Sequence, residues 1–192
     1  MASVATKPVT AKKFFEFVHR AENRDRFFEL ERGEIVEMPP PTKYHGFVCS
    51  NTVGIFRDFA ARRKKGYPCC NDSGIIVESD PDTVRGPDVS FYEDDQNADT
   101  MDREYTAQPP KVVVDVLYPG TSPNKVAKRV GQFLALGVGL VWIIDPEVRT
   151  IAVYQAGKLP KVLDETEELT GGDILPDFRC RVAEFFALPG RA

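Results

Sequence analysis

The chain has 192 residues, of which 42% are hydrophobic and 28% charged, and its formal net charge at pH 7 is −4. This length suits one domain with a sizeable core and is short for two domains. The negative net charge argues against a protein that coats nucleic acid non-specifically. It leaves room for a nuclease, because an acidic site can hold a metal ion while the basic contacts stay local.

Membrane, secreted and zinc-dependent classes find little support in the sequence. No apolar run is long enough to cross a bilayer. The N-terminus lacks the apolar segment of a signal peptide, so we expect a cytoplasmic protein without a membrane partner. The four cysteines do not follow zinc-site spacing, and we expect them to be reduced, partly buried thiols.

The N-terminal part predicts a flexible segment, followed by a helix and a hairpin. Residues 1–9 are expected to be flexible, ahead of a single domain that spans residues 10–189. Thr10 is a candidate cap for a helix over about 11–22. Short strands on both sides of Arg32-Gly33 then predict a hairpin with a tight glycine turn.

The middle of the chain predicts a long helix, several strands and an exposed loop. Apolar residues at helical spacing predict a helix over about 44–65, which Gly66 would end. A strand pair is expected around the turn 71–74, and another strand at 89–92. Residues 93–110 are rich in Asp, Asn and Gln and predict a long exposed loop.

The stretch KVVVDVLYPG, residues 111–120, predicts the central strand of a sheet. Its run of β-branched residues, closed by Pro-Gly, is typical of a strand buried on both faces. Asp115 lies in the middle of this strand. Burying an unpaired carboxylate is costly, so Asp115 must have a cation, several hydrogen-bond donors or a metal ion as its partner.

The C-terminal part completes a mixed sheet. Ser122 and Pro123 predict the start of a helix that ends near Gly137. LVWIIDP and RTIAVYQ then predict a hairpin, and FRCRVAEFFAL predicts a short terminal helix. Helices before and between strands, with one strand–helix–strand crossover, indicate an α/β or α+β domain with a mixed sheet.

Two carboxylates and one cation form the candidate site. Asp88 precedes the strand at 89–92, and the loop that follows allows this strand to lie beside the one that carries Asp115. Such a pair can bind magnesium through oxygen, although a turn role for Asp88 and an ion pair for Asp115 are the structural alternatives. On the helix after Gly120, Arg129 borders the apolar face and is best placed to reach Asp115, with Lys125 second.

A resemblance to a known family is carried by three segments: PDVSFYEDD, VVVDVLYPGTSP and GVGLVWIIDPEVRTIAVYQ. Together with FFELERGEIVEMPPPTKYH near the N-terminus, they resemble the Uma-two family of bacterial proteins assigned as restriction endonucleases in the PD-(D/E)xK nuclease superfamily. The resemblance covers roughly residues 27–186. It implies a restriction-endonuclease-like fold, a mixed β-sheet core flanked by helices, and DNA cleavage that depends on magnesium, with manganese able to replace it.

The resemblance also implies roles for individual residues. Asp88 matches the aspartate of the family's PD motif, and Asp115 matches a position that is usually Glu. Arg129 matches a lysine that the family carries on the following helix. His45 matches a family histidine and would act as an acid, a base or a ligand, and Glu29 would be a third carboxylate for the metal. A structural role is the alternative for both of these residues.

Asp115 and Arg129 both depart from the family pattern. Aspartate is one methylene shorter than glutamate, and arginine stays protonated and cannot act as a base, although it can bind a phosphate. Lys125 is the alternative cation for that task. The departures also favour a second function: a degenerate nuclease fold that binds protein or nucleic acid without cleavage. A nuclease that cuts both strands needs two sites, so we expect a homodimer.

Overall fold

The computed structural model describes residues 7–188. Residues 1–6 of the predicted flexible N-terminus, and residue 189 at the end of the predicted domain, lie outside the described residues. At Val9, the backbone N–H donates a hydrogen bond of 3.0 Å to the carbonyl oxygen of Gly33. Among the helices of the described residues, none is both long and apolar enough to cross a membrane.

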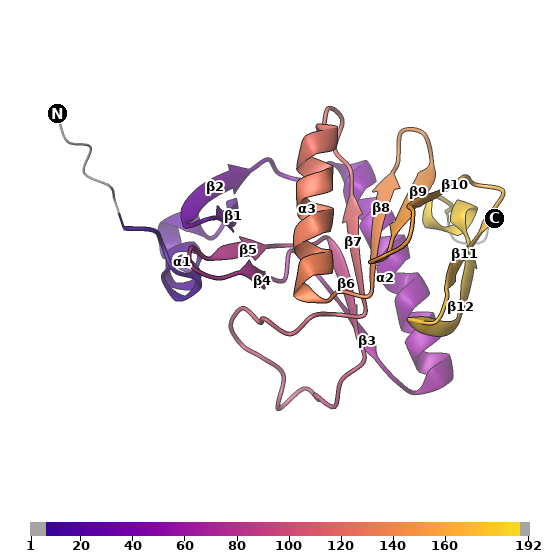
Figure 1. Cartoon of the computed structure of the whole chain (residues 1–192), viewed down its shortest axis with the longest axis horizontal. Coiled ribbons are helices and arrows are strands. Elements are labelled where there is room, and N and C mark those ends of the chain that lie inside the picture. Colours follow the sequence, from indigo (N-terminus) through magenta and orange to yellow (C-terminus); the bar gives the residue numbers. More distant parts are fainter. Residues whose placement is uncertain (1–6, 189–192) are drawn as a thin grey trace.

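A six-stranded mixed sheet lies at the centre of the molecule (Figure 1). Its strand order is β10–β9–β8–β7–β6–β3, in which β7 and β8 are parallel and the other neighbours antiparallel. All residues of β7 are buried, which confirms the predicted central strand. The strands are β3 (Tyr67–Cys70), β6 (Val89–Tyr92), β7 (Val112–Val116), β8 (Leu140–Asp145), β9 (Thr150–Tyr154) and β10 (Lys161–Leu163).

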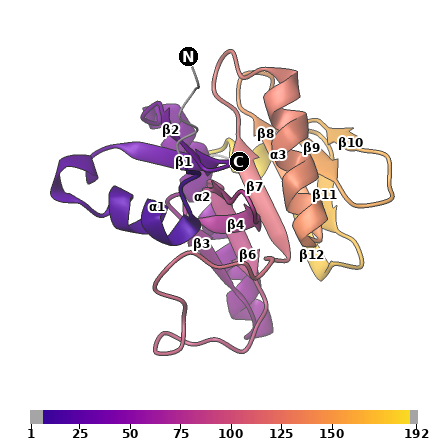
Figure 2. The same cartoon turned by 60° about the vertical axis from the view of Figure 1, so that its left-hand side comes forward.

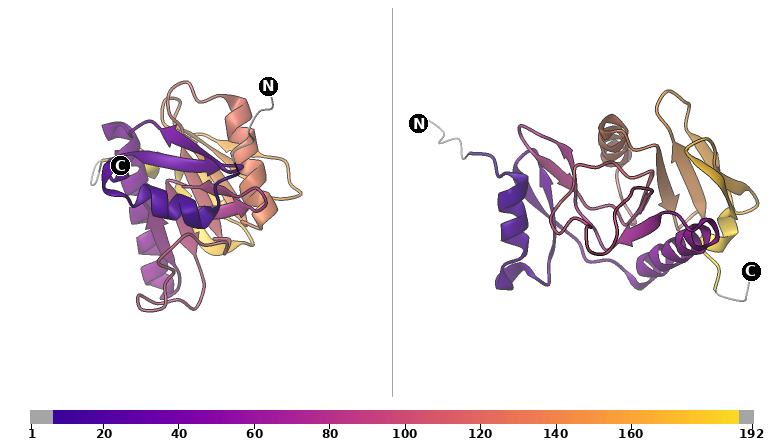
Figure 3. Two further views of the ribbon diagram at one scale, coloured as in Figure 1. Left: turned by 90° about the vertical axis from the view of Figure 1, so that its left-hand side faces the viewer. Right: turned by 90° about the horizontal axis from the view of Figure 1, so that it is seen from below.

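Two helices cover opposite faces of this sheet, α2 (Lys43–Arg63) and α3 (Pro123–Leu136) (Figure 3, right). On β7, Val112, Val114 and Val116 pack in the cluster that includes α2, whereas Val113 packs with residues of α3. Successive strand residues point to opposite faces, so Asp115 lies on the same face as Val113 and faces α3. The alternation along β7 therefore decides which helix can supply a partner for Asp115.

The core between the sheet and α2 is aromatic. The ring of Phe56 lies 5.0 Å from that of Phe91 and 5.4 Å from that of Trp142, centroid to centroid. Phe178, from the C-terminal part of the chain, packs on the same ring at 5.6 Å. Aromatic groups of this size bury a large apolar area, so the cluster is a major source of stability.

A four-stranded antiparallel sheet, β2–β1–β5–β4, stands beside the central sheet (Figure 2). Helix α1 packs on it through Ala11 and Phe14, which contact Leu30 and Val84 in a small core of their own. The elements are α1 (Ala11–Val18), the 3-10 helix η1 (Ala21–Asn23), β1 (Phe27–Glu31), β2 (Glu34–Met38), β4 (Ile75–Glu78) and β5 (Thr83–Arg85). At the other end, β11 (Glu168–Gly171) pairs with β12 (Leu175–Arg181), and the predicted terminal helix is the single 3-10 turn η2 (Val182–Phe185).

Most predicted helix ends are confirmed. The side chain of Thr10 caps α1, Ser122 caps α3, and Gly137 ends α3 in the left-handed conformation. The predicted end of α1 was too late, because the chain turns after Val18 into the separate turn η1. The predicted stop of α2 at Gly66 was also late, because Lys64 already adopts the left-handed conformation, with φ 52°.

The predicted strand pair around residues 71–74 was wrong. Strand β3 pairs with β6 in the central sheet, whereas β4 pairs with β5 in the small sheet. Asn71 and Asp72, at φ 65° and 54°, turn the chain from one sheet to the other. A left-handed turn is typical of Asn and Asp, and here it crosses between sheets instead of closing a hairpin.

Candidate active site

Asp88 and Asp115 lie close together, as their positions in the sequence predicted. Asp88 directly precedes β6, which runs antiparallel to β7, with Val89 opposite Val114. One carboxylate oxygen of Asp88, Oδ2, accepts a hydrogen bond of 2.6 Å from the backbone N–H of Val116. The main chain next to Asp115 thus fixes the orientation of Asp88.

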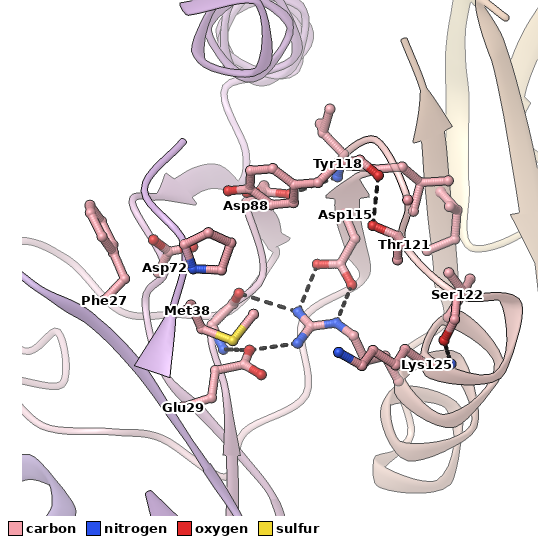
Figure 4. A pocket seen from close by; sticks show the side chains of 18 of the residues that line it. Phe27, Glu29, Met38, Asp72, Asp88, Asp115, Tyr118, Thr121, Ser122 and Lys125 are labelled. Carbon is pink, nitrogen blue, oxygen red and sulfur yellow. Dashed lines mark hydrogen bonds and ion pairs between the residues drawn. The ribbon is translucent and has the colours of Figure 1, made fainter. Parts of the chain in front are cut away.

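Arg129 on α3 reaches back to Asp115, which the helical pattern predicted. Its Nε lies 2.8 Å from Asp115 Oδ2, and its Nη2 lies 3.0 Å from Oδ1. The same guanidinium donates from Nη1 to Glu29 at 2.5 Å and from Nη2 to the carbonyl oxygen of Gly86 at 3.3 Å. Burial alone would lower the pKa of Arg129, but the two carboxylates outweigh it and raise the pKa well above its ordinary value. Figure 4 shows Asp115 and Glu29 on either side of these ion pairs.

Glu29, on β1, is buried and joins the small sheet to the site. Its Oε1 also accepts a hydrogen bond from the backbone N–H of Gly86 at 3.0 Å, and its Oε2 accepts one from Arg85 at 2.9 Å. Arg85 in turn donates from Nε to the amide oxygen of Gln132 on α3 at 2.9 Å. The carboxylate predicted as an auxiliary ligand is therefore also part of a buried polar network.

His45 lies at the start of α2, where the hydroxyl of Thr42 accepts a hydrogen bond from its backbone N–H. Its Nε2 is 3.2 Å from Asp88 Oδ1 and 3.2 Å from the carbonyl oxygen of Val116. The ring stacks on Tyr118, with centroids 4.4 Å apart. These contacts hold the imidazole against Asp88.

The environment shifts the pKa of both partners in this contact. Burial lowers the pKa of His45, but the hydrogen bond and the charge of Asp88 outweigh it, so the net shift is upward. Burial also raises the pKa of Asp88, with a further rise from Asp115 that the hydrogen bond from His45 opposes. The contact therefore favours a protonated His45 beside an ionised Asp88, whereas burial disfavours the charge on both groups.

Asp72 is a fourth carboxylate at the site, and the sequence analysis missed it. It follows β3 in the left-handed turn and lines the same cavity as Asp88 and Asp115. Desolvation and the nearby charges of Asp88 and Glu29 raise its pKa to about 6. The signal available in the sequence was its place directly after a strand, but an Asn-Asp pair there is more often a plain turn.

The main chain of Asp72 packs tightly against Gly86. A Cβ at Gly86 would lie 2.8 Å from the Cβ of Asp72 and 2.9 Å from its carbonyl oxygen. These distances are too short for a side chain, so glycine is needed two residues before Asp88. This close approach brings the end of β3 beside the segment that carries Asp88.

Lys125 lies on the first turn of α3, where it is exposed and lines the cavity. Within residues 7–188, its ammonium group forms no ion pair with Asp115 or any other carboxylate. Lys128, the next lysine on α3, instead forms an ion pair with Glu31. Of the two cations predicted to reach Asp115, only Arg129 contacts it.

Two cavities adjoin these groups. One has a volume of about 350 Å³ and extends from Asp115 along the β7–α3 connection to Lys125. The other, of about 380 Å³, extends toward α2 and is lined by His45 and Cys49. Four residues line both cavities: Phe27, Asp72, Asp88 and Tyr118.

The donors at the site fit a hard divalent cation. Four carboxylates line the first cavity, and carboxylate oxygen is the ligand that magnesium prefers. Arg129 contacts both oxygens of Asp115, but a carboxylate has about four acceptor positions and retains capacity for another partner.

A mixed donor set lies beside the carboxylates. Atoms of His45, Cys49 and Asp88 lie within 4.8 Å of one another. Burial raises the pKa of the Cys49 thiol, which makes that group a poor metal ligand. Within this closely spaced group, His45 and Asp88 are therefore the better ligands.

Comparisons with known proteins agree with this architecture. A family model named Uma2, with the description "Putative restriction endonuclease", matches residues 14–183. Among solved structures, the chain is similar to a "putative nuclease belonging to DUF820" from Anabaena variabilis, with a TM-score of 0.77 and 19% sequence identity. That match covers 93% of this chain and 98% of the other. Among curated proteins, none matches the chain.

Proposed function

Because the chain belongs to the Uma2 family, we propose that it is an endonuclease that hydrolyses phosphodiester bonds in DNA with the help of a divalent metal ion. One observation carries the proposal. Carboxylates from separate segments of the chain converge on one cavity beside the half-buried Arg129: Glu29, Asp72, Asp88 and Asp115. Such a concentration of negative charge is costly to maintain in a fold and is typical of sites that bind metal ions.

In the proposed enzyme, Asp88 and Asp115 would hold magnesium, or manganese in its place, with Glu29 and Asp72 as further oxygen donors. When bound, the ion supplies positive charge that polarises the phosphodiester and acidifies water. Before an ion binds, Arg129 offsets part of the carboxylate charge and holds Asp115 and Glu29 in place.

The contacts of each cation suggest a division of roles. Arg129 already donates to Asp115, Glu29 and the Gly86 carbonyl, so it acts in this proposal as a positioning residue. Lys125 stands exposed at the cavity wall and is the better group to bind a phosphate oxygen. His45 orients Asp88 through Nε2 and holds a proton next to it.

The second candidate function is a nuclease fold that binds a protein or nucleic acid without cutting. The observation in its favour is the two-point contact between Arg129 and Asp115, which engages both oxygens of a carboxylate already shorter than the usual glutamate. In this case Asp115 would serve mainly to compensate the charge of the half-buried Arg129. Two further expectations belong with the nuclease proposal: a homodimer, so that both strands can be cut, and a cytoplasmic location.

Cleavage of supercoiled plasmid and of single-stranded DNA, with magnesium or manganese, tests the proposal. The Asp88→Asn variant keeps the shape of the side chain, and we expect it to lose about 100-fold or more of the activity. Asp99→Asn, in the exposed loop, is the matched control, and circular dichroism checks that both variants fold. Clean wild-type protein that cuts neither substrate with either metal would favour the binding module instead.

A further inference from the structure

We infer that the substrate segment bound across the acidic site is an unpaired nucleic-acid strand, with one nucleoside in each of the two adjoining cavities. The inference rests on the proposed nuclease function, but an unpaired strand can be cut at a single site, so it does not need the homodimer expected for cutting both strands of a duplex. It concerns the groups beside the reacting phosphate, whereas the proposed function concerns the carboxylates themselves.

The arrangement of the cavities is the first observation. They extend from the acidic site in different directions, one toward Lys125 on α3 and the other toward Cys49 on α2. Asp72 and Asp88 line both cavities, so the acidic groups lie where the two meet. A strand whose phosphate sits at this junction would direct its two neighbouring nucleosides into opposite cavities.

The chemistry of the walls is the second observation. Phe27 and Tyr118 also line both cavities, and both are half-buried. Stacking on His45, with an angle of 16° between the rings, holds Tyr118 in place. Proteins that bind single strands combine aromatic side chains, on which any base can stack, with positively charged groups that hold the backbone. In Figure 4, Phe27 and Asp72 lie on one side of Asp115, and Ser122 and Lys125 lie on the other.

The α3 end of the first cavity carries positive charge, although the cavity as a whole is acidic. Lys125 lines it from the first turn of α3, and Ser122 caps the same helix. The N-terminus of a helix of 14 residues attracts anions, and the ammonium group of Lys125 adds to that attraction. The cavity therefore combines an aromatic wall, a cation and the acidic groups that would hold the metal ion.

The size of the cavities argues against an intact duplex. Volumes of about 350 and 380 Å³ lie in the range of cavities that enclose one small molecule each. The bases of a duplex are stacked and paired inside the helix, so none can enter such a cavity unless it is flipped out. Flipping costs a few kcal/mol and costs least where the base is already unpaired. An unpaired strand therefore fits the site at the lowest cost.

A set of matched oligonucleotides tests the inference: one single strand, the same strand in a perfect duplex, and a duplex with a central bubble. Cleavage is measured with magnesium and manganese, and binding is measured with calcium by fluorescence anisotropy. We expect the single strand and the bubble to be cut at least about tenfold faster than the duplex, and to bind correspondingly tighter. Equal rates on all three would overturn the inference and leave the nuclease proposal intact.

Two substitutions make the test specific to the cavities. Phe27→Leu and Tyr118→Leu are expected to weaken binding of the single strand about fivefold or more, because each removes one stacking surface. Phe15→Leu, on α1 and away from both cavities, is the control and should bind as the wild type does. If no substrate is cut, the proposed function fails, and the calcium binding data decide the inference separately. A preference for the unpaired strands that depends on Phe27 supports it, and equal binding of all three refutes it.

Discussion

Arg129 donates one hydrogen bond to each carboxylate oxygen of Asp115, and it donates a third to Glu29 on a different sheet. Because Asp115 belongs to the central sheet and Glu29 to the small one, the guanidinium of α3 connects the two sheets. The candidate site therefore also holds the two sheets together. Substitutions at the site will change stability as well as chemistry, and each experiment needs a control that separates the two.

Replacing Arg129 by methionine should destabilise the fold strongly. The variant keeps a long side chain but leaves the buried carboxylate of Asp115 without its cation and Glu29 with Arg85 alone, and breaking such a pair typically costs about 3–5 kcal/mol. Lys128→Met on the same helix removes only an exposed ion pair with Glu31 and should cost about 0–1 kcal/mol. Urea unfolding measures both, and equal midpoints for the two variants would show that the buried pair adds no stability.

Asp72 should make the stability of the protein depend on pH in a defined window. Its pKa is about 6 in the folded protein, against an ordinary value of 3.8. Between these values the folded state holds a proton that the unfolded state has lost, so stability falls as pH rises. Asp72→Asn removes this effect. The thermal midpoint of the variant minus that of the wild type should therefore increase from about pH 4 to pH 6. A difference that stays constant across this range would mean that Asp72 titrates normally.

Removing the carboxylate of Asp88 should lower the pKa of His45. In the wild type, the hydrogen bond and charge of Asp88 outweigh burial and raise the pKa above its ordinary value of 6.5. In Asp88→Asn, burial remains without the largest opposing contribution, so the pKa of His45 should fall relative to the wild type. Proton NMR can follow the titration, because the chain has two histidines and His19→Gln assigns the signals. An unchanged pKa in Asp88→Asn would show that the contact has no electrostatic effect on His45.

The aromatic core should be sensitive to loss of a single ring. Phe56 is fully buried and stacks on Phe91 and Trp142, so Phe56→Ala should cost about 3–5 kcal/mol through the cavity it leaves. Leu159→Ala, at a residue that is 94% exposed, should change stability by no more than about 0.5 kcal/mol. Chemical denaturation compares the two, and a small effect at Phe56 would mean that the sheet and α2 repack around the gap.

Local patterns in the sequence predicted the centre of the site well. The apolar run around Asp115 identified a buried strand, and helical spacing placed Arg129 next to it, because both features depend on residues close together in the chain. The resemblance added Glu29 and His45, whose positions in their own segments are not distinctive. The structure brings all of these residues to one place, and their roles in catalysis stay predictions.

The features that were missed depend on contacts between distant segments. Arg85 lies on β5, a strand of three residues that is too short to show any periodicity, yet it supports Glu29. Asp72 lies at the site only because β3 pairs with β6 in the central sheet, whereas β4 pairs with β5 in the small sheet. No property of residues 71–74 alone distinguishes that path from an ordinary hairpin.

The long connection between β6 and β7 separates the site residues into two groups along the chain. Residues 93–110 are mostly exposed, and the connection projects from the molecule before Thr106 pairs with Ile75 of β4 (Figure 2). Glu29, Asp72 and Asp88 come before this connection, and Asp115 and Arg129 come after it. A break in the connection would thus yield two fragments that each carry part of the acidic site. Pairing of β6 in one fragment with β7 in the other would restore the acidic site. The site can therefore form only when the two fragments associate.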